Sequence, residues 1–150
     1  MSAIASLTVV PRDSITELAR LARTSPSSFR TYLAEHGSKT RQEYDWSGYC
    51  MLYVLTYLEE RGIDLDQSEF NAESEAINSA YGLTTLITPA PGLLDQLDPG
   101  AHRAEDLVAH FEEMGVDFEE SGAAGLDTLR LLRDTVTELR DDQVLLLNIG

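Results

Sequence analysis

The fold is decided by one stretch in the middle of the chain, residues 49–58, which reads YCMLYVLTYL. This run predicts a helix that begins near Asp45 or Ser47 and ends before Gly62. Because apolar side chains occur nearly all round the helix, it belongs in the centre of the molecule. Four of its side chains are expected to be almost fully buried: Leu52, Val54, Leu55 and Leu58.

Two helices are expected before this stretch. Ser14 and Glu17 have the spacing of a capping box, which places the start of the first helix at Ser14. Ser25 is the predicted cap of the second helix, and Gly37 ends it. Residues 38–44 are polar and indicate a loop.

The chain after the central helix alternates between helical patterns and short apolar runs. Residues 83–100 contain three prolines and predict a long loop with one helical turn near 93–97. The last run, residues 144–149 (VLLLNI), is typical of a buried strand. The other expected elements are helices at 66–82, 101–114 and 126–140 and a short strand at 116–119. We therefore predict an α+β, helix-rich single domain with a small sheet.

Charge divides the chain into two parts. The net charge is −15, yet residues 1–41 hold six bases and three acids and so carry +3, which leaves −18 on residues 42–150. We interpret residues 1–41 as a basic two-helix N-terminal arm that docks on an acidic α+β body, residues 42–150. An acidic body repels phosphate backbones, so nucleic acid is an unfavourable partner. A protein with a basic surface is a favourable partner.

Composition also bears on location and cofactors. The N-terminus has no basic leader before its short apolar stretch, and no apolar run approaches the roughly 20 residues that cross a bilayer. Cys50 is the only cysteine, which excludes an internal disulfide and a cysteine zinc site. We expect a cytoplasmic protein without cofactors or contact with membranes.

Cys50 is also the one candidate nucleophile. A nearby histidine would have to stabilise its thiolate as an ion pair. Gln42 on the preceding loop could supply an oxyanion-hole amide. The alternative is that Cys50 packs as a small hydrophobe inside its apolar helix. Metal binding is not expected, because the three histidines are scattered and surface solvation explains them: His36, His102 and His110.

Residues 46–58 (WSGYCMLYVLTYL) resemble the nucleophile helix of papain-like cysteine peptidases of the bacteriocin-processing, double-glycine type. Residues 107–116 (LVAHFEEMGV) are similar to the helix–glycine–strand step of that family, and residues 129–148 to its next helix and strand. The resemblance implies a papain-like N-terminal half around the buried central helix. An alignment on Tyr57 and Leu58 places Trp46 at the nucleophile position, however, and the family's histidine lies on a strand beyond Gly150. The resemblance thus implies an inactive relative or one portion of a longer enzyme.

Residues 18–30 (LARLARTSPSSFR) resemble a helix-turn-helix of the transcription-regulator type and coincide with the basic segment. Three functions follow as hypotheses. The leading one is a non-catalytic protein-binding domain, of immunity or adaptor type, that uses its acidic surface. The alternatives are a cysteine peptidase or acyltransferase without its histidine in this chain, and a helix-turn-helix DNA-binding regulator. A histidine beside Cys50 would favour the enzyme hypothesis. Exposed side chains of Arg20, Arg23 and Arg30 would favour the DNA-binding hypothesis.

Overall fold

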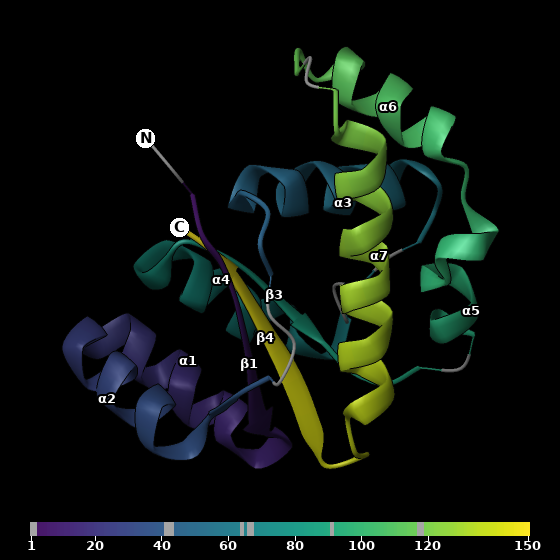
Figure 1. Cartoon of the computed structure of the whole chain (residues 1–150). Coiled ribbons are helices and arrows are strands. Elements are labelled where there is room, and N and C mark those ends of the chain that lie inside the picture. The colour runs from purple at the N-terminus through teal and green to yellow at the C-terminus, as the bar shows by residue number, and fades with distance from the viewer. Residues whose placement is uncertain (1–2, 41–43, 64, 66–67, 91, 117–118) are drawn as a thin grey trace.

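A four-stranded antiparallel sheet forms the middle of the protein (Figure 1). The computed structural model describes residues 3–40, 44–63, 65, 68–90, 92–116 and 119–150. The strand order is β2-β1-β4-β3, and β1 faces β4 along its whole length. The strands are β1 (Ala5–Pro11), β2 (Ser38–Lys39), β3 (Leu83–Ile87) and β4 (Gln143–Ile149).

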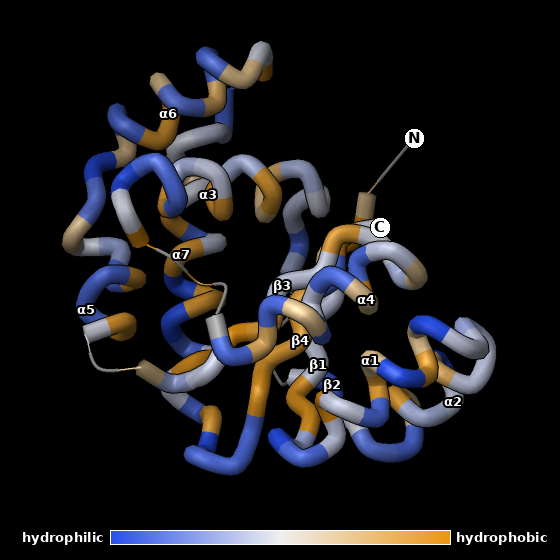
Figure 2. Tube along the Cα trace, turned by 180° about the vertical axis from the view of Figure 1, so that it is seen from behind, coloured by the Kyte–Doolittle hydropathy of each residue, from blue (hydrophilic) through white to orange (hydrophobic). Residues whose placement is uncertain are grey.

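Strand β4 is apolar on both faces, because helices cover the sheet on both sides. Val144 and Leu146 point into one core, which α1 (Ile15–Thr24), α2 (Pro26–His36) and α4 (Asn71–Tyr81) cover. Leu145 and Leu147 point into the other core. Figure 2 shows β4 as a hydrophobic band between the two layers. The second core is closed by α3 (Gly48–Glu60), α5 (Leu93–Leu97), α6 (Ala104–Glu113) and α7 (Ser121–Glu138).

The prediction of a helix-rich α+β domain with a small sheet is confirmed. Helix α3 begins after Ser47, whose hydroxyl accepts a hydrogen bond from the Tyr49 amide at 3.2 Å. Val54 and Leu58 are fully buried as expected. The expectation is wrong for Leu52 and Leu55, which are only partly buried. Helix α3 packs on the sheet and against α6 and α7, so part of its circumference stays open to solvent.

Several local predictions were confirmed and others were wrong. The helical turn at 93–97 and the helix capped by Ser25 are both present. Residues 83–87 form strand β3 and not a loop, residues 38–39 of the predicted loop form strand β2, and β1 was not predicted. The capping box at Ser14 is wrong: Ser14 makes no side-chain capping bond, and its hydroxyl accepts from Tyr32 instead. Residues 117–118 of the predicted short strand lie outside the described residues, and Val116 and Glu119 on either side of them are not in a strand.

Helix α7 begins five residues earlier than residue 126, the predicted start. Its extension is possible because Gly122 and Gly125 lie where α7 passes close to α6. The 3₁₀ turns are η1 (Arg12–Ser14), η2 (Ser68–Phe70) and η3 (Pro99–Ala101).

The first and second parts of the chain share one sheet. Strand β1, from the basic segment, lies between β2 and β4, and the residues just before β1 meet the start of α3. The Gly48 amide donates to the Ala3 carbonyl at 2.8 Å. A Cβ at Gly48 would lie 2.9 Å from backbone atoms of Ala3 and Ile4, so only glycine allows this approach. The division at residue 41 therefore describes charge and does not mark separate bodies.

Candidate functional site

Cys50 lies in the first turn of α3 with 6% of its surface exposed. Burial raises the pKa of its thiol, and the hydrogen bond at the Ser47 backbone opposes this with a smaller effect. The cysteine borders an apolar hollow of about 350 Å³ that contains no cationic side chain among the described residues. The hollow is lined by Trp46, Ser47, Tyr49, Cys50, Tyr53 and Val116. Gln42, the predicted oxyanion-hole residue, lies outside the described residues.

All three histidines lie in the described part of the chain, and none of the contacts found there joins one to Cys50. His36 is exposed on α2, on the opposite side of the sheet, where its ring lies 4.1 Å from that of Tyr32. His102 and His110 both approach Tyr57, seven residues further along α3. Seven residues of helix span about 10 Å, so these rings are too far along the axis to deprotonate Cys50 directly.

His102 has a hydrogen-bond partner at each ring nitrogen. Its Nε2 lies 2.6 Å from the Gln96 carbonyl oxygen, which can only accept, so this nitrogen carries the proton. Its Nδ1 then accepts from the Tyr57 hydroxyl at 3.0 Å. Burial raises the pKa of Tyr57, which keeps that hydroxyl protonated as the donor. Both ring nitrogens of His102 are therefore hydrogen-bonded, and the residue links α3 to the turn before α6.

His110 differs from the expectation of a surface histidine, because only 4% of its surface is exposed. It lies in α6 and packs against the C-terminal half of α3. Its Nε2 is 2.9 Å from Thr56 Oγ1, and its Nδ1 is 3.2 Å from Glu60 Oε2. The helical pattern contains a signal for this burial: His110 follows Leu107 by three residues and precedes Phe111, and both neighbours are fully buried.

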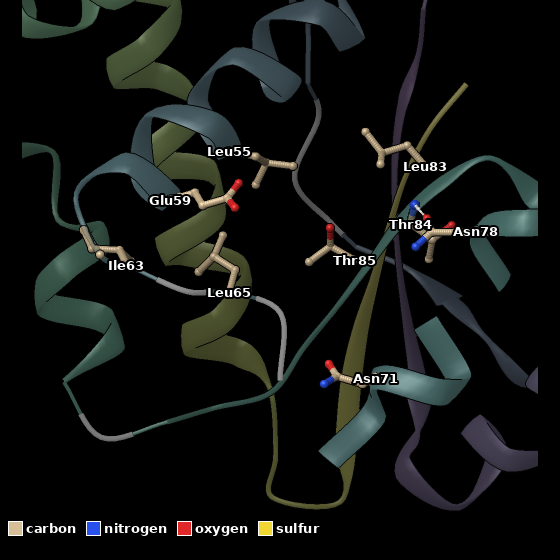
Figure 3. A pocket seen from close by; sticks show the side chains of 10 residues that line it. Leu55, Glu59, Ile63, Leu65, Asn71, Asn78, Leu83, Thr84 and Thr85 are labelled. Atoms are coloured by element: carbon tan, nitrogen blue, oxygen red, sulfur yellow. Dashed lines mark hydrogen bonds between the residues drawn. The ribbon is translucent and has the colours of Figure 1, made fainter. Parts of the chain in front are cut away.

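A cavity of about 590 Å³ lies between the end of α3 and strand β3 (Figure 3). Glu59 is the one ionisable side chain among its described lining residues, and Asn78 accepts a hydrogen bond from the Thr84 amide beside it. A single carboxylate with amides and hydroxyls can bind a ligand but provides no acid–base pair for catalysis. The lining comprises Leu55, Glu59, Gly62, Ile63, Leu65, Asn71, Asn78, Leu83, Thr84 and Thr85.

Acidic charge gathers at the ends of α3 and α6. Four exposed carboxylates occupy the last turns of these two packed helices, and Glu60 and Glu113 approach each other beside His110 while Glu59 borders the cavity next to β3. We call this set the acidic corner: Glu59, Glu60, Glu112 and Glu113. Among the described residues, only Glu60 of this set has a positively charged or protonatable partner, His110.

The basic segment neutralises little of the acidic body. In the described ranges, one ion pair joins residues 1–41 to the rest, between Arg12 and Glu69. Arg61, Arg103, Arg130 and Arg133 each already contact a carboxylate of the body itself. The surplus of acids is therefore left facing solvent.

The helix pair α1–α2 departs from a helix-turn-helix in its connection. Ser25 alone separates the two helices, whereas the DNA-binding motif uses a turn of about three or four residues. The three arginines of the hypothesis are exposed as DNA binding would require. However, Arg20 pairs with Glu17, and Arg30 lies over the Tyr81 ring at 6.0 Å.

Comparisons of the chain with models of protein families, with curated proteins and with solved structures found no match. The resemblance to papain-like peptidases stays a prediction. In the ranges that the structure describes, no helix combines the length and the hydrophobicity that crossing a bilayer requires.

Proposed function

We propose that this protein is a non-catalytic binding domain, of immunity or adaptor type, whose acidic corner engages a basic surface on a partner protein. The observation that carries the proposal is the uncompensated charge at the ends of α3 and α6. Complementary potentials of this kind accelerate association and select partners by charge.

The geometry at Cys50 supports a binding role over a catalytic one. A thiol acts as a nucleophile when an adjacent base or a lowered pKa supplies the thiolate. Cys50 has a raised pKa, an apolar surround and no histidine in contact among the described residues. These properties favour Cys50 as a packing residue.

An NMR titration with an arginine-rich peptide of about ten residues tests the proposal, with an acidic peptide of equal length as the ligand control. We expect amide shifts to cluster in the last turns of α3 and α6 and to shrink steeply as salt is raised, because exposed charges are screened. Shifts spread evenly over all acidic surfaces, or absent at low salt, would contradict the proposal.

Charge variants sharpen this experiment. Glu59→Gln/Glu112→Gln removes two charges from the acidic corner, and at about 0.5 kcal/mol per exposed pair it should weaken peptide binding about fivefold. The matched control is Glu35→Gln/Glu75→Gln, which removes two exposed charges from α2 and α4 on the other side of the sheet. An equal loss in both double variants would show that net charge alone, and not the corner, determines binding.

A further inference from the structure

The buried ring of His110 lies beside two carboxylates of the acidic corner. One ligand atom from each of Glu60, His110 and Glu113 can be chosen so that all three lie within 4.8 Å of one another. His110 and Glu113 are three residues apart on one face of α6, while Glu60 comes from the last turn of α3. The three residues thus join two helices at a single point.

The hydrogen bonds around the ring fix which nitrogen carries a proton. The Thr56 hydroxyl has one hydrogen, and it donates that hydrogen to the Tyr53 carbonyl at 2.8 Å. Thr56 Oγ1 can therefore only accept from His110, so Nε2 carries the ring proton. In the neutral ring Nδ1 then presents a lone pair, 3.2 Å from the carboxylate of Glu60.

Two lone pairs facing each other repel unless a positive charge lies between them. A second proton on the ring would satisfy Nδ1 and Glu60 only. A divalent ion would use all three groups, since imidazole nitrogen and carboxylate oxygen are both ordinary zinc ligands. The bond from Nε2 to Thr56 is also the kind of outer contact that orients a metal-binding histidine.

From this geometry we propose that Glu60, His110 and Glu113 bind one divalent ion of the zinc class. Ligand atoms on one tetrahedral zinc ion lie about 3.3–3.6 Å apart, because each bond is about 2.0–2.2 Å long. Rotation of the two exposed glutamate side chains brings ligand atoms that already lie within 4.8 Å of one another to this spacing. Three protein ligands leave the fourth tetrahedral position to water or to a group of a bound partner. His102 is not a ligand, since both of its nitrogens are occupied.

The site would also hold α6 to α3. His110 contacts Thr56, Tyr57 and Glu60 across this interface. Arg61 adds an ion pair with Asp106 at 3.2 Å. A bound ion replaces the repulsion among the carboxylates with attraction. The thermal unfolding temperature should therefore rise when Zn²⁺ is added.

The test is isothermal titration of the untagged full chain with Zn²⁺. We expect saturable binding of one ion per chain with a Kd below about 10 µM. This binding should persist at ordinary salt concentrations of the buffer. Glu113→Gln changes one exposed ligand and leaves the core intact, and it should weaken Zn²⁺ binding about tenfold or more. Glu112→Gln removes the same charge one residue away and should change the affinity less than about twofold.

Nitrogen NMR of the imidazole rings supplies a second readout. Zn²⁺ should shift Nδ1 of His110 while Nε2 keeps its proton, and the nitrogens of His36 and His102 should not move. Absence of saturable binding, or equal weakening in Glu112→Gln and Glu113→Gln, would overturn the site. The peptide titration above uses Glu59 and Glu112, neither of which is a proposed ligand, so failure of one proposal is distinguishable from failure of the other.

Discussion

Leu58→Ala measures how much the central helix contributes to stability. Leu58 has no exposed surface and packs in the core between the sheet and α7. Truncation removes buried methyl and methylene groups and leaves a cavity that rigid neighbours fill poorly. Such substitutions cost about 2–5 kcal/mol, and complete burial at the centre of the core places Leu58 in the upper half of that range. A domain of this size has a free energy of unfolding of about 5–15 kcal/mol, so the loss is a large fraction of the total.

Leu55→Ala is the matched control, one helical turn earlier on α3. Leu55 is partly exposed and borders the cavity beside β3, so its truncation removes less buried surface and enlarges a space already open to water (Figure 3). We expect a loss of about 1 kcal/mol.

Urea unfolding followed by circular dichroism gives both free energies. For a chain of this length each kcal/mol lowers the melting temperature by about 2–4 °C, so Leu58→Ala should melt about 7–20 °C below the parent protein. A cost at Leu55 equal to or above that at Leu58 would refute the described orientation of α3.

Three further predictions use other contacts. Asn148→Ala should cost about 1–3 kcal/mol in urea unfolding, because the Asn148 amide donates to Thr84 Oγ1 at 3.1 Å and to two carbonyls that would lose a partner. Gly125→Ala should also destabilise the fold, by about 1 kcal/mol net in urea unfolding. The new Cβ would meet the buried side chain of Leu107 at 2.9–3.1 Å. Overpacking costs about 1–3 kcal/mol, which exceeds the gain of about 1 kcal/mol in helix propensity. Iodoacetamide should label Cys50 more slowly than a free thiol at pH 7, with the rate rising only at alkaline pH, because burial favours the neutral thiol; fast labelling near pH 6 would contradict the packing role.

The sequence predicted the helices well because their signals are local. A cap at Ser25, a stop at Gly37 and an apolar run at 49–58 each determine their own surroundings. The three missed strands, β1, β2 and β3, depend on partners that are distant in the chain. Strand β1 pairs with β4 across more than 130 residues, and β3 follows a glycine and precedes prolines that favour a loop.

The same reasoning explains what was missed at the candidate sites. Cys50 attracted attention because it is the only cysteine, yet its chemistry depends on neighbours that no local pattern supplies. His110 appeared to be a solvated residue because its partners, Thr56 and Glu60, lie at least 50 residues away on α3. Its position on the apolar face of α6 could have indicated burial, but the direction of the Thr56 hydroxyl becomes visible only when the two helices are packed together. Because of that direction, the lone pair of Nδ1 faces carboxylates. This arrangement is the reason for proposing His110 as an ion ligand.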